Sequence, residues 1–408
     1  MELIGLLFAL LLLLVFGFRF FYAVVRVFTK RKHFPPAKPG NRYAVMIAAR
    51  NEDQVIGPLL DSLRKQDYPS ELIDLYVVAD NCTDRTAEEA RAHGATVYER
   101  HNLEQASKGY ALQYLFNKVL PLGISYDGFF VFDADNLLDP GYISAMHAAF
   151  VQNKTIIIGY RTAKNFGDSW VTAAYGLYFL HESEFLNASR DKLGTTCFLS
   201  GTGCLFPAAF LKDGWHWTGL TEDLECTLEV ITTGNHICYC GDAVLYDEQP
   251  RRFGESIPQR SRWVRGYTDA ITKNMGKLFR SLFRPRGFGA FDFIMNLGPL
   301  IGCVGGVIFE IVKIVTFASQ GMAPGMIILQ ETLGFLSVYG GMLLIGAVTL
   351  FAEWTRIVCP ARKKLLYTLF FPLFMISYLF VYILAVLQKP QWKAIKHDVS
   401  ISIDDLKK

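Results

Sequence analysis

Long apolar runs at the two ends of the chain constrain its fold more than any other feature. One run covers residues 3–28, and three more lie late in the chain, at residues 293–318, 326–352 and 365–387. Each is long enough to cross a hydrocarbon layer of about 30 Å as a helix. Hydrophobic residues make up 51% of the chain and gather in these runs, so we expect an integral membrane protein with a globular middle part.

The first run predicts a transmembrane anchor over residues 1–34. A signal peptide is the alternative, but the apolar stretch is too long and no small-residue cleavage site follows it. The basic residues Lys30, Arg31 and Lys32 follow the run and are expected to face anionic headgroups. By the positive-inside rule they place the next domain in the cytoplasm, so we expect a multi-pass protein of the plasma membrane.

The late runs predict three transmembrane helices over residues 291–390 and a tail over residues 391–408. The loop between the last two runs is basic, which also favours the cytoplasm. Its basic residues are Arg356, Arg362, Lys363 and Lys364. A count of four spans then puts the tail outside, although the tail carries Lys389, Lys393 and Lys396. Either the tail departs from the rule or one run is re-entrant.

Two charged residues interrupt the first of these late runs. Glu310 and Lys313 lie one helical turn apart, and charges that remain unpaired in hydrocarbon are costly. They are expected either to pair or reach the interface, or to line a polar passage for a sugar chain.

The middle of the chain, residues 35–250, has the pattern of an α/β domain. After a Pro-rich linker, short apolar runs alternate with amphipathic stretches, which predicts a mostly parallel, Rossmann-like sheet with helical crossovers. The expected strands cover residues 43–49, 72–79, 95–98, 128–132 and 155–159, and the expected helices cover residues 54–65, 85–93 and 109–119.

Residues 251–290 are basic and amphipathic, which predicts helices lying in the membrane interface. Four apolar side chains share one helical face there: Leu278, Phe279, Leu282 and Phe283.

Charge and cysteine content exclude other classes of protein. A net charge of +3 is too small to indicate nucleic-acid binding. Cys238 and Cys240 form a CxC without a second pair or a His at zinc-ligand spacing, so we expect reduced cytoplasmic thiols rather than a structural metal site. No G-x-G-x-x-G follows the first expected strand, which disfavours a dinucleotide-dependent oxidoreductase.

Carboxylates stand at the ends of two expected strands. Asp80 ends one strand, where ligands of open parallel sheets bind, and Asp84 suits the N-cap of the next helix. Asp133 and Asp135 follow a buried strand and point the same way if the backbone stays extended. Two such close carboxylates suit a hard divalent cation, Mg²⁺ or Mn²⁺, bridging a diphosphate.

Two further motifs lie later in the middle domain. Glu222 and Asp223 open an expected helix, where acids ordinarily act as caps, but either could serve as a general base. Gln259, Arg262 and Trp263 share one helical face and present an amide, a guanidinium and an indole. Such a set can grip a diphosphate and a sugar ring, or lie at the membrane interface.

These elements together resemble the family 2 inverting glycosyltransferases, in particular their membrane-bound branch with cellulose, hyaluronan and poly-N-acetylglucosamine synthases. That family has a GT-A fold and a pattern written D, DxD, (T)ED, QxxRW. The resemblance covers roughly residues 43–267. One departure is Asn81, where many relatives carry a second Asp.

The resemblance implies a role for each matching residue. Asp80 would contact uridine, with Ala49 and Glu52 nearby, and Lys108 would lie near the donor diphosphate. Asp133 would approach the diphosphate and Asp135 would bind the metal most directly. Asp223, with Glu222 beside it, would be the general base. The remaining donor and acceptor residues would be Gln259 and Arg262 on the diphosphate, Trp263 under the acceptor sugar, and Gly201 and Thr202 in the acceptor loop.

The implied reaction is a single displacement in which Asp223 takes the proton of an acceptor hydroxyl. The donor would be a UDP-sugar, for which UDP-glucose and UDP-N-acetylglucosamine both fit, and inversion would give a β-linkage. For this branch of the family, the expected product is a growing β-linked polysaccharide that is extended at its non-reducing end. The membrane region could also secrete this polymer. A single transfer to a membrane lipid is the alternative, and a catalytically silent nucleotide-sugar receptor is a third.

Overall fold

The computed structural model describes residues 2–387 and 397–407. Eight strands form one sheet: β1 (Tyr43–Ala49), β2 (Ile73–Asp80), β3 (Thr96–Arg100), β4 (Gly128–Asp133), β5 (Leu137–Leu138), β6 (Ile156–Ala163), β7 (Cys204–Pro207) and β8 (Ile237–Asp247). The helices of the globular part are α2 (Ile56–Arg64), α3 (Thr86–Ala92), α4 (Lys108–Val119), α5 (Tyr142–Asn153), α6 (Trp170–Leu180), the π-helix η3 (His181–Asn187), α7 (Ala188–Lys192) and α8 (Glu222–Thr233). Short 3-10 turns are η1 (Ser70–Leu72), η2 (Leu120–Leu122) and η4 (Ala208–Leu211). The remaining helices are α1 (Glu2–Phe28), α9 (Phe253–Ser281), α10 (Phe288–Met295), α11 (Gly298–Ser319), α12 (Pro324–Ala352), α13 (Ala361–Thr368), α14 (Phe371–Ile376), α15 (Tyr378–Leu387) and α16 (Ile403–Leu406).

The sheet is mixed rather than mostly parallel, which corrects the expectation from sequence. Its order is β3-β2-β1-β4-β7-β6-β8-β5. The first four strands in this order are parallel, as the crossovers at α2, α3 and α4 require. Strand β7 then pairs antiparallel with both β4 and β6. The sequence did not indicate β7, because this strand of four residues between two loops is too short to show a pattern.

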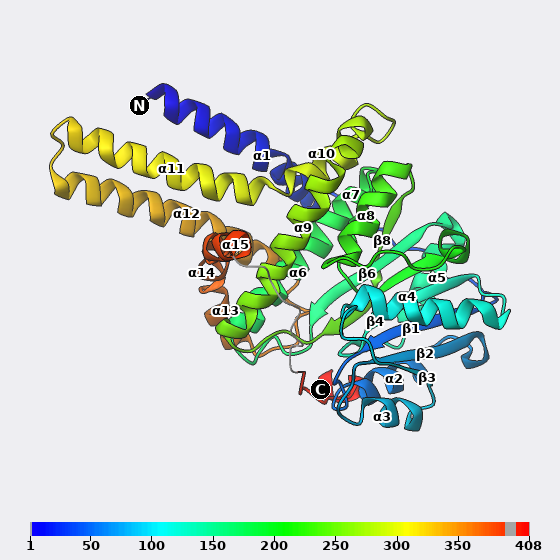
Figure 1. Cartoon of the computed structure of the whole chain (residues 1–408). Helices are drawn as coiled ribbons and strands as arrows, with labels where there is room; N and C mark the ends of the chain where they lie inside the picture. The colour runs from blue at the N-terminus through cyan, green and yellow to red at the C-terminus, as the bar shows by residue number, and fades with distance from the viewer. Residues whose placement is uncertain (1, 388–396, 408) are drawn as a thin grey trace.

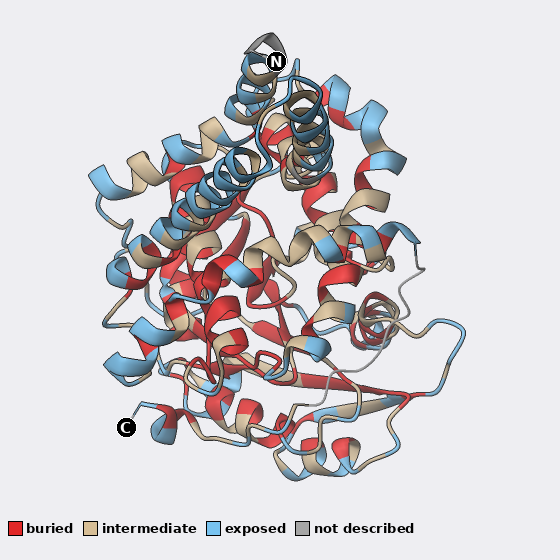
Figure 2. Cartoon of the chain, turned by 90° about the vertical axis from the view of Figure 1, so that its left-hand side faces the viewer, coloured by how far each residue is buried: buried red, intermediate tan, exposed pale blue. Residues whose placement is uncertain are grey.

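The central strands are buried on both faces. Along β1, Ala44 and Met46 pack with α4 and α6 on one side of the sheet, whereas Val45 and Ile47 pack with α2 and α5 on the other. A parallel strand covered by helices on both faces has a continuous apolar sequence rather than an alternating one. Figure 2 shows this buried core at the centre of the globular part.

Three long helices project together from the globular part (Figure 1). The apolar segment Gly5–Phe28 of α1, together with α11 and α12, is long and apolar enough to cross a membrane. Small residues allow α1 and α11 to approach closely, because a Cβ atom at Gly298 would lie 2.1 Å from Val15 Cγ1. Their outer surfaces are largely exposed (Figure 2).

The last hydrophobic run does not form a straight fourth helix. It breaks between α13 and the segment Phe371–Leu387, with a bend of 42°, because Pro372 cannot continue the preceding helical hydrogen bonds. Helices α13, α14 and α15 lie against the globular part while α1, α11 and α12 project away from it (Figure 1). A bend of this kind occurs both in a broken span and in a re-entrant loop, so both alternatives for the tail stay predictions.

The described part of the tail lies on the globular domain. Lys65 at the end of α2 pairs with Asp404, and the C-terminus lies beside α2 (Figure 1). The basic residues Lys389, Lys393 and Lys396, whose side the sequence left open, lie outside the described residues.

The charges within α11 are paired. Lys313 forms ion pairs with Glu310 on the same helix and with Glu331 on α12, the latter at 3.1 Å. The sequence did not indicate Glu331 as a partner. The cluster joins two adjacent helices, which fits the first of the two expectations for Glu310 and Lys313.

The basic residues at and after the end of α1 form ion pairs with acidic residues of the same chain. Arg26 and Arg31 donate to Glu184 of η3 at 2.7 and 3.0 Å, and Arg31 also pairs with Glu353 after α12. Both carboxylates have fully buried side chains. The expectation that Arg31 faces lipid headgroups is therefore wrong, because its charge is neutralised inside the protein.

Helix α9 is one continuous helix of 29 residues. Phe279 and Phe283 are exposed near its C-terminal end, but Leu278 is fully buried against Phe293 and Ile271. The predicted apolar face is therefore divided, with one side packed on α8 and α10 and the other exposed.

We predict that Glu184→Ala destabilises the whole protein. The change leaves Arg26 and Arg31 without their shared buried partner, and removing one member of a buried ion pair typically costs about 3–5 kcal/mol. The midpoint of thermal unfolding in detergent should fall by several degrees. Arg85→Ala is the matched control, because it removes the surface pairs with Glu88 and Glu89, worth about 0–1 kcal/mol. Equal midpoints for both variants would contradict the role of the buried network.

Candidate functional site

Three parallel strands end side by side at one edge of the sheet. Ala49 at the end of β1 pairs with Ala79 of β2, and Ala48 pairs with Asp133 of β4. Asp80 and Asp133 therefore lie at the same edge, with Glu52 in the loop after β1. This is the edge at which ligands of open α/β sheets bind.

Asp80 is held by a buried cation. Its carboxylate is almost fully buried and accepts from Arg100 Nη1 at 2.5 Å and from Asn81 Nδ2 at 3.1 Å. Asn81 has a positive φ of 54°, a conformation that Asn tolerates better than most residues. Asp tolerates this φ as well, but an Asp side chain could not donate to Asp80 and to Asn102 O as Asn81 Nδ2 does, so the departure from the family pattern has a local hydrogen-bonding reason. Asp84 accepts from the backbone N–H of Thr86 at 3.1 Å, but the N-cap of α3 is Arg85, so Asp84 lies one residue before the position predicted for it.

The backbone turns between Asp133 and Asp135, so the two carboxylates do not share one direction as an extended strand would require. Asn136 and Thr202 stabilise this turn: the Asp133 N–H donates to Asn136 Oδ1 at 3.1 Å and to Thr202 Oγ1 at 2.9 Å. Thr202 in turn donates to Asn136 Oδ1 at 2.5 Å. Its hydroxyl is buried and used in these contacts, and an acceptor-binding role for it stays a prediction.

Asp133 belongs to a cluster around Lys108. Lys108 Nζ lies 2.5 Å from Asp133 Oδ1 and 3.5 Å from Glu222 Oε1, and it donates to Gly201 O at 2.6 Å. Burial opposes the charge on Lys108, but Asp133 and Glu222 raise its pKa. Four residues from different parts of the chain thus converge, and all four were predicted from sequence.

Gly109 allows the start of α4 to lie close enough for Lys108 to reach Asp133 and Glu222. A Cβ atom there would lie 2.3 Å from Trp217 O, so only glycine allows the first turn of α4 to approach that backbone.

Asp223 lies beside this cluster without joining its ion pairs. A Cβ atom on Gly201, whose φ is +87°, would be 3.6 Å from Asp223 Oδ2, so the acceptor loop and the carboxylate are neighbours. Burial, and next the charge of Glu222, raise the pKa of Asp223 to about 7. A carboxylate with this pKa is suited to accepting a proton near neutral pH.

Asp135 lies in a second cluster, which the sequence did not indicate. Its Oδ2 accepts from Glu248 N at 3.0 Å, and Lys164 Nζ bridges Asp135 O and Glu248 Oε2 at 3.0 Å each. Burial opposes ionisation of Asp135, but the charges of His397 and Lys164 hold its pKa below the usual range.

Arg161 and Asp247 complete this second cluster. They form a buried ion pair, and Arg161 Nη1 also donates to Ser200 O at 2.6 Å. Asp247 and Glu248 end β8, so recognising that strand would have indicated a further strand-end acidic pair.

The C-terminal segment supplies an unexpected residue to the site. His397 Nδ1 lies 2.9 Å from Glu52 Oε2, and its Nε2 lies 4.0 Å from Asp135 Oδ2. Glu52 was predicted as a donor-binding residue, but no sequence signal connected it to a histidine 345 positions later.

Carboxylates at the strand ends offer the oxygen ligands that a divalent cation prefers, although the ligand atoms of Asp133, Asp135 and Asp247 do not all lie within 4.8 Å of one another. Asp133, Asp135 and Asp247 bring carboxylate oxygens to one strand edge, and Asp247 Oδ1 is buried without a hydrogen-bond partner among residues 2–387 and 397–407. Oxygen ligands with an imidazole nearby suit Mg²⁺ or Mn²⁺. Asp135 is the residue best placed to hold such an ion, because Lys108 already neutralises Asp133.

The Gln259, Arg262 and Trp263 segment lies on α9 at the side of the site. Tyr175 OH donates to Gln259 Oε1 at 2.8 Å, and Trp263 packs edge-on against Tyr175 and Phe179. In the described part of the chain, no hydrogen bond or ion pair joins Gln259 or Arg262 to the strand-end carboxylates. Their predicted contacts with a diphosphate stay predictions.

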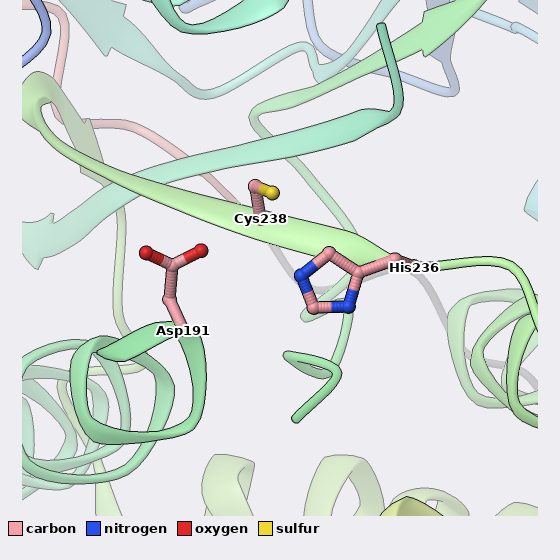
Figure 3. A group of neighbouring side chains, drawn as sticks. All are labelled: Asp191, His236 and Cys238. Carbon is pink, nitrogen blue, oxygen red and sulfur yellow. The ribbon is translucent and has the colours of Figure 1, made fainter. Parts of the chain in front are cut away.

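A separate group of ligand-type side chains lies at the opposite end of β8 (Figure 3). Ligand atoms of Asp191, His236 and Cys238 lie within 4.8 Å of one another. Asp191 is already bound by Lys32 at 2.9 Å, and burial, with Asp191 next, raises the pKa of Cys238 to about 12. His236 is thus a possible ligand beside Cys238 that the expectation from sequence did not count, and the group takes no part in the strand-end site.

Comparison with known families identifies the arrangement. A family model described as "Glycosyltransferase like family 2" matches residues 39–266, the region that holds both clusters and the start of α9. The chain belongs to this family. Its domain has a GT-A fold with a mixed sheet, and several residues predicted to bind a nucleotide sugar lie at the ends of β1, β2 and β4.

Relatives of this glycosyltransferase are distant. A probable glycosyltransferase of Sulfolobus acidocaldarius is 24% identical over 58% of this chain and 52% of its own length. A beta-monoglucosyldiacylglycerol synthase of Nostoc is 26% identical over 62% of this chain and 56% of its own length. The chain thus spans about half the length of these curated relatives.

Among solved structures, the mannosyltransferase PcManGT from Pyrobaculum calidifontis, in complex with GDP-Man and Mn²⁺, resembles this protein over almost the whole chain. The TM-score is 0.63 at 17% identity, covering 95% of this chain and 100% of that one. The likeness establishes a shared fold that includes the helices beyond the catalytic domain.

We predict that Thr202→Val impairs the site while preserving the fold. Valine has nearly the same shape but leaves the Asp133 N–H and Asn136 with one partner fewer, a loss of about 1–3 kcal/mol. Sugar transfer should fall roughly tenfold at an unchanged far-UV circular dichroism spectrum. Thr233→Val, at an exposed position of α8, is the control and should retain full activity. Unaltered transfer by Thr202→Val would show that the turn does not need this hydroxyl.

Proposed function

We propose that this glycosyltransferase moves one sugar, with inversion and with a divalent cation, from a nucleoside diphosphate sugar to an acceptor embedded in the membrane. The single observation that carries the proposal is Asp223, a carboxylate with a pKa near 7 at the side of a strand-end cluster of cations and carboxylates. The donor class that the family resemblance favours is a UDP-sugar, with UDP-glucose and UDP-N-acetylglucosamine as first choices.

Asp223 acts as the base in this proposal. It accepts the proton of the acceptor hydroxyl as that oxygen attacks the anomeric carbon, and the bond to the diphosphate breaks in the same displacement. Glu222 beside it is engaged with Lys108, whereas Asp223 forms no ion pair within the described residues. This difference in partners favours Asp223 over Glu222 as the base.

Lys108 and Asp135 serve the leaving group. Lys108 is positioned by Gly201 O and Asp133, from which it can donate to a phosphate oxygen. A divalent cation held by Asp135 would neutralise negative charge that develops on the diphosphate. Asp80, Glu52 and Ala49 lie at the neighbouring strand ends, where they would contact the nucleoside.

Helix α9 supports a membrane-embedded acceptor. Gly266 of α9 packs directly on Thr221, since a Cβ atom there would lie 2.5 Å from Thr221 Oγ1, so α9 covers the loop before Asp223. About 20 Å further along this helix, at 1.5 Å per residue, Phe279 is 58% exposed, and Phe283, just past the end of α9, is 78% exposed. The chain then continues through α10 into the projecting α11.

A lipid acceptor agrees with the structure better than a long polysaccharide. The polar residues within α11 and α12 are paired with each other, which offers little support for a polar passage. Two relatives bear names with lipid acceptors, the beta-monoglucosyldiacylglycerol synthase and a 4,4'-diaponeurosporenoate glycosyltransferase of Staphylococcus aureus, 41% identical over 73 residues. We place the catalytic domain on the cytoplasmic face of the plasma membrane, with α1, α11 and α12 as the spans.

We predict that Asp223→Asn binds the donor normally but transfers sugar about 10²–10⁴-fold more slowly, because general-base catalysis contributes this much. Donor affinity is measured by isothermal titration and transfer by release of the nucleoside diphosphate. Asp213→Asn is an exposed control and should behave as the wild type. Normal transfer by Asp223→Asn would refute the base assignment.

We also predict a pH dependence of the transfer rate. Since Asp223 must be deprotonated to accept a proton and its pKa is raised to about 7, the rate should rise roughly tenfold between about pH 6 and pH 8 and then level off. The residual rate of Asp223→Asn should lack this rise. A rate that is flat over this range in the wild type would assign the base to another group.

The type of product tests the acceptor. The protein in lipid nanodiscs is supplied with a panel of radiolabelled nucleotide sugars and Mn²⁺, and the products are extracted with organic solvent. A labelled species in the organic phase that carries one sugar supports the proposal. A ladder of water-soluble oligosaccharides would replace the lipid acceptor by a polysaccharide, and the absence of transfer from every donor would favour a nucleotide-sugar receptor.

A further inference from the structure

One face of α1 is apolar and exposed along the whole helix. Pairs of adjacent side chains recur there every seven residues, and seven residues are close to two helical turns, so the pairs share a face. The other side of the helix is covered by protein, since Val15 and Tyr22 are buried. We call the eight side chains of these pairs, each more than half exposed, the exposed stripe: Leu6, Leu7, Leu13, Leu14, Phe20, Phe21, Val27 and Phe28.

A basic hollow begins where the exposed stripe ends. Lys30, two residues after Phe28, lines this hollow together with Lys192 at the end of α7. Figure 1 shows the inner end of α1 beside α7, and Ser189 Oγ of α7 donates to Tyr22 O of α1 at 2.8 Å. The hollow is therefore a fixed feature of the contact between these two helices.

The hollow carries an excess of positive charge. Lys32 is paired at 2.9 Å with Asp191, the one acid among the described residues that line the hollow. Two arginines of the lining are engaged by buried carboxylates. Lys30 and Lys192 are exposed, and neither forms an ion pair with a residue in the ranges 2–387 and 397–407. Two ammonium groups are thus left for an anion from outside the chain.

The length of α1 puts the hollow at the membrane surface. The segment Gly5–Phe28 has 24 residues, which make about 36 Å of helix at 1.5 Å per residue. A hydrocarbon core is about 30 Å thick. When α1 spans the membrane, the residues just after Phe28 therefore lie at the level of the headgroups. An apolar surface for an acyl chain and a cationic hollow for a phosphate meet at this level.

Charge favours a lipid over a second copy of the chain as the occupant of this surface. Two copies that span the membrane in the same direction would bring their unpaired lysines to one level, and like charges placed together oppose association. An anionic lipid covers the apolar surface and also supplies the missing negative charge.

We propose that an anionic phospholipid binds at the inner end of α1, with its phosphate between Lys30 and Lys192 and an acyl chain along the inner part of the exposed stripe. This inference rests on the proposed function for the placement of α1 across the membrane, and it adds a lipid site separate from the acceptor expected beside α9. The bound lipid would bridge α1 and α7 and so help to fasten the projecting helices to the catalytic domain. Arg31 and Lys32 take no part, because carboxylates of the protein hold them.

The test measures the binding of single lipids to the full-length protein in detergent by native mass spectrometry, with phosphatidylglycerol as the probe. Each lysine near an anionic surface contributes about fivefold, so Lys30→Gln/Lys192→Gln should bind phosphatidylglycerol about 30-fold more weakly than the wild type. Phosphatidylcholine, which has the phosphate but no net charge, should bind weakly to both. The matched control is Lys118→Gln/Lys212→Gln, which removes two exposed lysines elsewhere on the globular part and should bind as the wild type does.

A phosphatidylglycerol with a photoactivatable group in its acyl chain locates the site. We expect cross-links within residues 20–28 of the wild type and their loss in Lys30→Gln/Lys192→Gln. Soluble glycerol phosphate, the headgroup without its chains, should not displace the lipid. Displacement by this compound would assign the hollow to a free phosphate compound and overturn the lipid.

Three further outcomes contradict the inference. These are equal affinities of the wild type and Lys30→Gln/Lys192→Gln, cross-links confined to α9, and a dimer in which the exposed stripe is closed to the cross-linker. Binding is read without donor or metal, so it does not depend on sugar transfer. A protein that transfers sugar but has no such lipid site leaves the proposed function standing, whereas one that binds the lipid here and transfers no sugar refutes the transfer reaction alone.

Discussion

The buried carboxylates of Glu184 and Glu353 hold the projecting helices and the catalytic sheet in one arrangement. Arg26 and Arg31 reach them from the end of α1, and Arg356 from the loop after α12. Separating such groups would leave desolvated charges without partners, which is far more costly than breaking a surface pair. Apolar packing of α12 on α14 and of α1 on η3 adds to these ion pairs, so both charges and apolar contacts at their inner ends orient the projecting helices.

The ion pairs of Glu184 are connected to the candidate site through the packing of η3, α6 and α9. Glu184 lies on η3, whose π-helical turn continues α6, and α6 supplies Tyr175 and Phe179 to the packing of Trp263. One turn earlier on α9, the buried Arg260 donates to Phe374 O and Ser377 Oγ of the bent C-terminal run. The helix that covers the loop before Asp223 is thus fixed both to the catalytic domain and to the segment that would meet the membrane.

Residue patterns were sufficient for the strand ends but not for contacts between distant segments. Strands β1, β2 and β4 are uniformly apolar and end in Ala or Asp, so their edge and the carboxylates at 80 and 133 could be predicted. Strand β8 was missed because Gly241 and Asp242 interrupt its apolar pattern at a bulge, and with it Asp247 and Glu248. His397 lies about 260 residues after Asp135 in the sequence, yet its segment docks beside Asp135 and Glu52. Local periodicity contains no signal for such a contact. The break in the last run was not predicted from Pro372, although a proline inside an apolar helix disrupts its hydrogen bonds.

The turn between Asp133 and Asp135 explains how one acidic motif can serve two chemical purposes. An extended backbone would direct both carboxylates to the same place, where their repulsion would have to be offset by one ion. Instead, Thr202 and Asn136 hold a turn that assigns Asp133 to Lys108, on the side of Asp223. Asp135 is left on the side of Glu52, His397 and Glu248. One carboxylate is neutralised by a fixed cation of the protein, while the other stays available for an exchangeable one. The pKa of Asp223, on the side of Lys108, is raised mainly by burial and next by the charge of Glu222.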